Sequence, residues 1–339
     1  MFGRGKQQPL LLSPAGAAGS GMGRRRYLTF LAVTIALVAS YHLLQAPTPS
    51  SRYHALFLTL GSNASAAAHL RALTLRPHVA GTEANAAAAE YVRAALSSLS
   101  FPTRVTPYSV LLSYPVHRSL SLSAPGHATA AFALVQDTYP DDPNAAVSAE
   151  VVPTFLAYSA TGSAAAEAVY ANYGRAEDYA YLASHGVNVT GKVAVARYGE
   201  VYRGDKVRNA RIAGAAAAVI YTDFKDYTPG KAFPDGPWMP PTGVQVGSTF
   251  KGVGDPTTPM WASSEGCERV SIAEAMDTDD MPGIPALPVS GRDGEEILQL
   301  IAGDVAPQDW QGGEGAPVYR LGPGPAVLNL TYTVSCCGE

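Results

Sequence analysis

The side chains that hold catalytic metal ions are those of histidine, cysteine, aspartate and glutamate, and their spacing in this sequence does not suit a metal centre. The three cysteines form no Cys-x-x-Cys pair, and none of the seven histidines is followed two residues later by aspartate. The paired acids Glu295-Glu296, Asp141-Asp142 and Asp279-Asp280 are interpreted as solvated helix or loop charges. The sequence therefore predicts no zinc site within these residues. The histidines are His42, His54, His69, His78, His117, His127 and His185.

No other catalytic motif is present, because the chain contains no Gly-x-Ser-x-Gly, Walker or Gly-x-Gly-x-x-Gly sequence. Its net charge is −4 and charged residues make up 15% of it, which excludes the basic field that nucleic-acid binding needs. One basic cluster on an expected short helix suggests either a phosphate or polyanion site or a solvated helix face, and the solvated face is favoured. Its members are Arg203, Lys206, Arg208 and Arg211.

The N-terminal part of the chain carries an uncharged run of 18 residues, Tyr27–Leu44, directly after Arg24–Arg26. About 20 apolar residues span a bilayer as a helix, and flanking arginines stay on the cytoplasmic side. The pattern predicts a cytoplasmic tail at 1–26, a transmembrane signal anchor at 27–45 and a lumenal or extracellular chain from about residue 46, which is type II topology. The alternatives are a cleaved signal peptide and a buried core helix. The polar segment 1–26 and the apolar run after it are both long for a cleaved signal peptide, which favours the anchor.

Three Asn-x-Ser/Thr sequences follow the expected anchor and are candidate sites of N-glycosylation. They begin at Asn63, Asn188 and Asn329. Because glycosylation takes place in the secretory pathway, the three motifs agree with a lumenal placement. We therefore expect a membrane glycoprotein of the endoplasmic reticulum or the plasma membrane.

The first half of the region after the anchor favours helices. A helix is predicted over Tyr53–Leu60, and a second over Glu83–Leu99, where apolar residues recur at helical spacing and Thr82 can act as the N-cap. Strands are predicted at Thr103–Ser113 and Ser119–Leu122, before a proline-rich irregular stretch that continues to about residue 153.

The second half of this region has the pattern of an α/β unit. A buried strand is predicted at Gly191–Tyr198, a short helix at Asp205–Ala213 with Asp205 as a cap, and a second buried strand at Ala217–Tyr221. A further strand at Ile284–Val289 leads to a helix at Asp293–Ile301. The expected fold class is therefore mixed α/β.

Six ordered motifs between residues 53 and 330 resemble landmarks of the glutamate carboxypeptidase II family, which consists of M28-type zinc carboxypeptidases, and the plant members look most similar. The most specific stretch, Gly191–Ala210, resembles the protease-associated (PA) core of that family. The motifs are Val79-Ala-Gly-Thr-Glu83, Val110-Leu-Leu-Ser-Tyr-Pro115, Asn172-Tyr-Gly-Arg-Ala-Glu-Asp178, Gly191–Ala210, Gly252-Val-Gly-Asp-Pro-Thr-Thr-Pro259 and Ile284-Pro-Ala-Leu-Pro288.

The resemblance implies a PA-type apical domain that is inserted after the first segment of an incomplete zinc-peptidase domain. The linker and that first segment would occupy 46–113, and the apical domain 114–330 with its PA core at about 151–290. Residues 331–339 depart from the family pattern and are interpreted as a divergent tail. The remaining peptidase segment and the dimerisation domain have no counterpart, so we expect a truncated chain that is monomeric where the family is homodimeric.

The resemblance also implies roles for individual residues. Arg175 would bind the carboxylate of a C-terminal glutamate, since a guanidinium matches a carboxylate with two hydrogen bonds. The alternative is a surface arginine that pairs with neighbouring acids. Ser248 would be a second substrate contact, and Thr258 and Trp261 would supply part of a calcium site.

The activity that the resemblance implies is zinc-dependent release of C-terminal glutamate from peptides. Full-length members are expected to hold two zinc ions and a calcium ion, whereas this chain lacks the zinc ligands and is expected to be inactive alone. Its expected partners are the membrane and, in a full-length form, a peptide that ends in glutamate. The alternative function is a membrane-tethered PA module with a binding or regulatory role.

Overall fold

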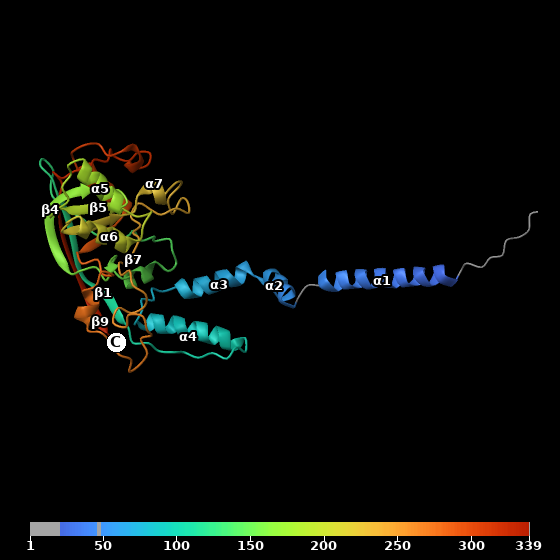
Figure 1. The fold of residues 1–339 in the computed structure, drawn as a ribbon. Coiled ribbons are helices and arrows are strands. Elements are labelled where there is room, and N and C mark those ends of the chain that lie inside the picture. Colours follow the sequence, from blue (N-terminus) through green and yellow to red (C-terminus); the bar gives the residue numbers. More distant parts are fainter. Residues whose placement is uncertain (1–20, 46–48, 339) are drawn as a thin grey trace, which may run out of the picture. The chain divides into compact units, whose positions relative to one another are not determined.

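The computed structural model describes residues 21–45 and 49–338, and the chain divides into two units, Met1–Leu70 and Arg71–Glu339 (Figure 1). The first unit contains the helices α1 (Gly21–Gln45) and α2 (Pro49–Leu60) and most of α3 (Asn63–Thr74). Within α1, residues Gly23–Leu44 form a helix long and apolar enough to cross a membrane. The predicted helix at Tyr53–Leu60 is confirmed. The alanine-rich helix α3 was not predicted, although alanine is the strongest helix former.

The second unit begins with a helix that the sequence predicted closely. Helix α4 covers Glu83–Ser98, and the Thr82 side chain accepts a hydrogen bond from the amide of Asn85, as an N-cap residue does. Both the helix and its cap are confirmed. Val92 and Leu96 on this helix are 43% and 42% exposed, so its apolar stripe is not covered within the described residues.

The centre of the second unit is a seven-stranded sheet with the strand order β2-β1-β9-β4-β5-β6-β8, and a separate pair of strands joins β3 to β7. The strands are β1 (Leu111–Ser123), β2 (Ala130–Ala131), β3 (Leu156–Ala157), β4 (Gly162–Tyr170), β5 (Val193–Arg197), β6 (Ala217–Tyr221), β7 (Gly247–Ser248), β8 (Ala286–Val289) and β9 (Val327–Gly338). The helical elements are η1 (Ala145–Glu150), α5 (Ala176–Ser184), α6 (Arg203–Ile212), α7 (Phe224–Tyr227), α8 (Ile272–Met276), α9 (Gly291–Gln299) and η2 (Gln308–Trp310).

One half of the sheet is antiparallel and is built on the pairing of β1 with β9, which extends from Leu111↔Gly338 to Ser123↔Val327. The strand predicted at Thr103–Ser113 is wrong except for its last three residues, whereas the strand predicted at Ser119–Leu122 lies within β1. The backbone near residue 110 bonds elsewhere, because the amide of Ser109 donates to the carbonyl of Ser263. The predicted boundary between residues 330 and 331 falls inside β9.

The other half of the sheet is parallel and includes the predicted α/β unit. Strands β5 and β6 are buried at every residue, which explains their unbroken apolar sequences. The strand–helix–strand prediction is confirmed, but the predicted cap is wrong. Helix α6 begins at Arg203 with Tyr202 as its N-cap, and Asp205 lies in the first turn, where it pairs with Lys251 at 2.7 Å.

The strand predicted at Ile284–Val289 and the helix predicted at Asp293–Ile301 correspond to β8 and α9. Helix α9 begins earlier than predicted because the Ser290 hydroxyl accepts a hydrogen bond from the amide of Asp293. The helix packs closely on β6 through Gly294, where a Cβ atom would lie 2.5 Å from the Tyr221 ring. A side chain at this position would push the helix away from the sheet.

The basic cluster predicted on α6 does not form one solvated face. Lys206 is buried, and its ammonium group donates to the carbonyls of Tyr173 and Gly199, both at 2.6 Å. Arg208 and Arg211 turn instead toward Asp279, at 3.9 and 3.3 Å. The interpretation as a solvated face is therefore wrong for Lys206, whose aliphatic stem packs between two loops.

The free energy of unfolding should depend on pH through Lys206. Burial lowers its pKa from 10.5 to about 7, so between these values the unfolded chain binds more protons than the folded chain. Stability should therefore rise as pH increases from 7.5 to 9.5, by at most about 1.4 kcal/mol per pH unit. Chemical denaturation at several pH values measures this slope. Lys206→Met should flatten it, whereas Lys251→Met, at an exposed lysine, should not; a flat profile for the unmodified protein would contradict this assignment.

A second prediction concerns the buried Tyr332 hydroxyl on β9, which donates to the carbonyl of Leu156 at 2.7 Å and accepts from its amide at 3.1 Å. Tyr332→Phe should lower the free energy of unfolding by about 1–3 kcal/mol, because buried backbone groups lose a partner. Denaturant titration measures the loss. The control Thr333→Val, on the other face of the same strand, should change stability by less than about 0.5 kcal/mol. Equal effects of the two variants would argue against this role.

Candidate functional site

A site with unpaired hydrogen-bond donors lies where α6 begins, against the segment 245–250. The Arg203 guanidinium reaches the carbonyl of Ser248 through Nη1 at 3.4 Å. Gly247 makes this approach feasible, since a Cβ atom there would lie 2.6 Å from Nη1. The Nε atom of Arg203 is buried and has no hydrogen-bond partner among the described residues.

A second unpaired donor belongs to the same segment. The Nε2 atom of Gln245 is also buried without a partner in the part of the chain that the structure describes. Two tyrosines hold this segment in place. Tyr198 donates to the carbonyl of Gln245 at 2.8 Å, and Tyr202 donates to the carbonyl of Ser248 at 2.6 Å.

Each of these two donors lacks an acceptor among the described residues. A buried polar group without a partner costs on the order of 1–3 kcal/mol, and more when it is charged. A ligand that offers acceptor atoms would remove this cost. An arginine donor is best satisfied by an anionic oxygen of the carboxylate or phosphate type.

Ser248, one of the two predicted substrate contacts, lies beside Arg203 in β7. Its backbone carbonyl accepts from both Arg203 and Tyr202, and its hydroxyl accepts from the amide of Phe250 at 3.1 Å. The structure therefore places Ser248 in this site. The sequence pattern placed Arg203 in a basic cluster for which a phosphate or polyanion site was the less favoured interpretation, and it did not identify Gln245.

Arg175, the other predicted substrate contact, is the N-cap residue of α5 and is engaged within its own loop. Its Nε and Nη2 atoms donate to the Asp178 carboxylate at 3.1 and 2.9 Å, and Glu177 lies 3.3 Å away. The hydrogen bond to Asp178 raises the pKa of Arg175. Asp178 is buried and also accepts from Asn172 at 3.0 Å, which in turn accepts from the buried Arg197. Arg175 therefore pairs with neighbouring acidic residues, as the alternative to a substrate contact describes.

The residues predicted to bind calcium share one turn. The amide of Trp261 donates to the carbonyl of Thr258 at 3.3 Å, and the Thr258 hydroxyl lies 2.7 Å from that of Ser263. Calcium takes six to eight oxygen ligands. The buried carboxylate in this region, Asp255, is already bound by Arg269 at 2.8 Å and by Thr257. The turn alone does not fit a calcium ion.

The described residues do not fit a two-zinc centre either. Nowhere in residues 21–45 and 49–338 do three histidine, cysteine, aspartate or glutamate side chains come together in a group that could hold a metal. In the Glu295-Glu296 pair, Glu296 is exposed as expected, whereas Glu295 is half-buried and burial raises its pKa. No step of a metal-dependent reaction is therefore assigned to these residues.

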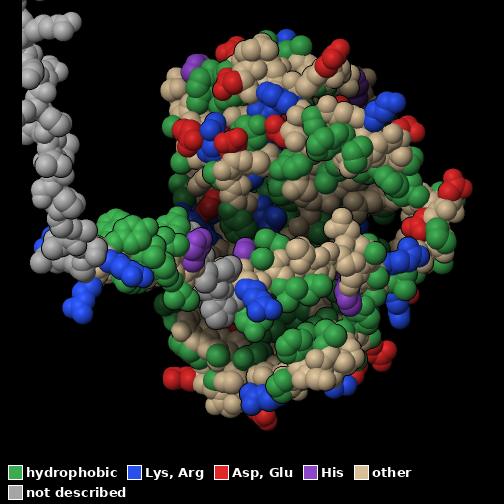
Figure 2. All heavy atoms as spheres, turned by 90° about the vertical axis from the view of Figure 1, so that its right-hand side faces the viewer, with side chains coloured by type: hydrophobic (Ala, Val, Ile, Leu, Met, Phe, Trp, Pro, Cys, Tyr) green, Lys and Arg blue, Asp and Glu red, His purple; other side chains and the backbone are tan. Residues whose placement is uncertain are grey.

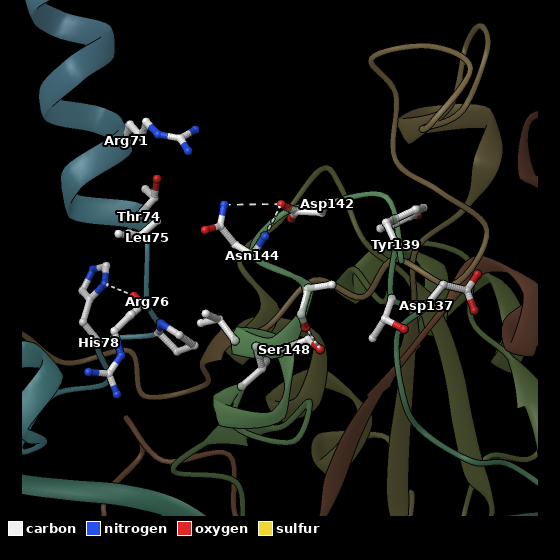
Figure 3. Close-up of a pocket in the computed structure, with 15 residues that line it drawn as sticks. Arg71, Thr74, Leu75, Arg76, His78, Asp137, Tyr139, Asp142, Asn144 and Ser148 are labelled. Atoms are coloured by element: carbon white, nitrogen blue, oxygen red, sulfur yellow. Dashed lines mark hydrogen bonds between the residues drawn. The ribbon is translucent and has the colours of Figure 1, made fainter.

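A separate open cavity of about 550 Å³ lies between the end of α3 and the loop that contains η1 (Figure 3). Arg71 and Asn144 face each other across it, and Arg76 forms an ion pair with Glu150 at 2.8 Å. The Asp142 carboxylate accepts a hydrogen bond from the backbone N–H of Asn144 at 2.8 Å. The cavity contains none of the predicted site residues.

The distribution of charged side chains on one face agrees with the prediction that the chain has no basic field for nucleic-acid binding. On the face drawn in Figure 2, acidic and basic side chains are interspersed and form no large basic patch. The three candidate glycosylation residues are all exposed: Asn63, Asn188 and Asn329.

Comparison with known proteins identifies the family of this chain. The family model described as "PA domain" matches residues 147–250. The chain is 49% identical over 315 residues to "Probable glutamate carboxypeptidase LAMP1" of Arabidopsis thaliana, covering 92% of this chain and 44% of that protein. It is 41% identical to "Probable glutamate carboxypeptidase VP8" of Zea mays, covering 80% and 35%, respectively. It is 38% identical to a "Glutamate carboxypeptidase 2 homolog" of Caenorhabditis elegans, covering 76% and 34%.

Among solved structures, an "Aminopeptidase from Aneurinibacillus sp. strain AM-1" matches with a TM-score of 0.40 and 17% identity, covering 80% of this chain and 44% of that one. The chain spans less than half the length of the curated relatives it matches. Over that span the identity is high, and the mixed α/β fold carries a PA domain. This chain therefore belongs to the glutamate carboxypeptidase II family and corresponds to its portion that contains the PA domain.

Proposed function

We propose that this chain is a membrane-anchored glutamate carboxypeptidase-like protein whose second unit binds the carboxylate end of a peptide substrate. The observation that carries the proposal is the pair of buried, unpaired donors, Arg203 Nε and Gln245 Nε2. The names of the relatives, which are glutamate carboxypeptidases, supply the substrate class. A C-terminal glutamate presents two carboxylates, either of which matches an arginine fork.

The arrangement around Arg203 suits recognition because the surrounding segment is held before any ligand arrives. Tyr202 bonds to the carbonyls of both Ser248 and Phe250, at 2.6 and 2.8 Å. A pre-organised site loses less conformational entropy on binding than a mobile one. Arg175 remains a second candidate for the carboxylate contact, although Asp178 already occupies two of its donors.

Membrane anchoring is the second part of the proposal. It is supported by the apolar helix at Gly23–Leu44, whose N-terminal end carries Arg24–Arg26. Since arginines flanking a span remain cytoplasmic, the second unit would lie in the lumen or outside the cell. The same orientation would expose Asn63, Asn188 and Asn329 to glycosylation.

The described residues include no group of metal ligands that could support hydrolysis. Zinc peptidases use converging His, Asp and Glu ligands and a carboxylate base for the attacking water. We therefore propose that the residues described here recognise a ligand and do not cleave it by themselves; zinc and calcium ligands would come from parts of the relatives outside the span that this chain matches. Substrate recognition without hydrolysis also describes the second candidate function, a tethered PA module with a binding or regulatory role.

The carboxylate site can be tested by isothermal titration of the purified chain in detergent with a dipeptide that ends in glutamate. Arg203→Gln should weaken binding about 10–100-fold, because a charge-assisted hydrogen bond contributes about 1.5–3 kcal/mol. Lys251→Gln, at an exposed cation near the site, is the matched control and should leave the affinity unchanged. Loss of binding in Arg175→Gln with no change in Arg203→Gln would assign the contact to Arg175 instead.

Catalytic inactivity can be tested on the same preparation. Incubation with the dipeptide and added zinc should release no glutamate above background, as measured by amino-acid analysis. The dipeptide with an amidated C-terminus is the control for contaminating peptidases. Release of glutamate that a chelator abolishes would contradict the proposal.

A further inference from the structure

The loops that lead into the two candidate arginines meet at one buried side chain. Arg203 follows the loop 199–202, and Arg175 ends the loop 171–175. Lys206 lies about one turn further along α6 and is only 1% exposed. Its ammonium group donates to the carbonyls of Gly199 and Tyr173, both at 2.6 Å. A single ammonium group therefore joins the two loops.

The loop 199–202 has a backbone that needs such support. Gly199 and Glu200 have φ angles of 106° and 63°. Glycine adopts the left-handed region readily, but a residue with a Cβ atom, such as glutamate, is disfavoured there. The backbone amide of Lys206 donates to the carbonyl of Tyr202 at 3.2 Å, so Lys206 bonds to both ends of the loop. These bonds set the direction in which the chain enters α6 at Arg203.

The loop 171–175 rests on the same side of α6. Asn209, one turn after Lys206, donates through Nδ2 to the carbonyl of Gly174 at 2.9 Å. Gly174 has a φ of 68°, and a Cβ atom there would lie 3.2 Å from the Cβ atom of Lys206. The Lys206 ammonium also lies 5.6 Å from the centroid of the Tyr173 ring, which attracts a cation. The loop thus packs directly on the Lys206 side chain.

Lys206 can change its charge near neutral pH. Burial lowers its pKa from 10.5 to about 7. Two carboxylates near the ammonium favour its charged form, and two guanidinium groups oppose it. These four groups are Asp178, Glu200, Arg175 and Arg197. Burial raises the pKa of Tyr173, the other titratable group beside the ammonium, to about 12, so this phenol stays neutral while Lys206 titrates.

We propose that Lys206 is a positioning residue for carboxylate recognition, and that the affinity of the Arg203 site for a carboxylate falls when Lys206 loses its proton. The inference rests on the carboxylate site proposed above. A hydrogen bond from an ammonium group is stronger than one from a neutral amine, so deprotonation loosens the loop that leads into Arg203. Because Lys206 also holds the loop before Arg175, the same dependence applies whichever arginine makes the contact.

The coupling between binding and protonation is reciprocal. If the protonated form binds a carboxylate more tightly, then carboxylate binding must raise the proton affinity of Lys206 by the same factor. The chain should therefore take up protons when it binds its ligand near neutral pH. A side chain that only stabilised the fold would give no such uptake.

The test is calorimetric titration of the purified full chain in detergent with an N-acetylated dipeptide that ends in glutamate. The acetyl group removes the amine, and carboxylates titrate near pH 4, so the ligand keeps its charge between pH 6 and pH 8.5. The affinity should be about 3–10-fold lower at pH 8.5 than at pH 6. At pH 7.4, the heats in imidazole and Tris buffers, which supply no anionic buffer species, should show uptake of about 0.3–0.5 proton per ligand.

Lys206→Met keeps most of the apolar stem and removes the titrating group. This variant should bind no more tightly than the unmodified chain does at pH 8.5, with equal affinity at both pH values and no proton uptake. If it fails to fold, Lys206→Gln, whose neutral amide can still donate, should show the same flat profile. The matched control is Lys225→Met, because Lys225 also donates to two backbone carbonyls, those of Asp309 and Gln311, at 3.2 and 3.1 Å. This control should behave like the unmodified chain.

The outcomes separate this inference from the proposed function. Binding that Arg203→Gln weakens, with equal affinity at both pH values and no proton uptake, overturns the role of Lys206 and leaves the carboxylate site intact. A pH dependence that persists unchanged in Lys206→Met assigns the titration to another group and also overturns the inference. Absence of dipeptide binding at both pH values overturns the proposed function and this inference together.

Discussion

The architecture of the second unit depends on the ladder between β1 and β9. These strands pair along their whole length although about 200 residues separate them in the chain. Strand β9 also pairs with β4, from Gly162↔Tyr332 to Glu167↔Val327. It therefore joins the antiparallel half of the sheet to the parallel half. Without β9, the strand β1 would lose its strand pairing to the rest of the seven-stranded sheet apart from the two-residue β2.

The candidate site follows from the other half of the same sheet. The parallel strands β5 and β6 are fully buried, so the polar side chains that follow them must find partners at the carboxyl edge of the sheet. Arg197 does so with Asn172 and with the buried Asp223, at 2.8 and 3.5 Å. Lys206 does so with two backbone carbonyls. By contrast, five described residues keep a buried side-chain atom without a hydrogen-bond partner: Tyr179, Arg203, Arg208, Thr222 and Gln245.

Local patterns predicted the elements whose sequences are locally consistent. Strands β5 and β6, helix α6 between them, and helix α4 with its Thr82 cap all have the periodicity of the structure they adopt. Strand β4 was not predicted, because Gly162–Tyr170 is mainly alanine, glycine and serine, which have weak strand propensity. Its neighbours β5 and β9 make it a strand. For the candidate site, the resemblance identified Ser248 before the structure was known. Whether Arg203 Nε has a hydrogen-bond partner could not be predicted, because it depends on the tertiary contacts of Arg203 with the segment 245–250.

The position of β9 in the chain also sets the order in which this unit can be completed during synthesis. Ribosomes add about 5–20 residues per second, so β1 would wait roughly 10–40 s before its long partner emerges. During that interval the apolar side chains of Leu120 and Leu122, which are buried in the finished sheet, have no strand beside them except the two-residue β2. Pairing over so long a sequence separation is also slow to form. The nascent chain therefore exposes an aggregation-prone edge until β9 has been synthesised.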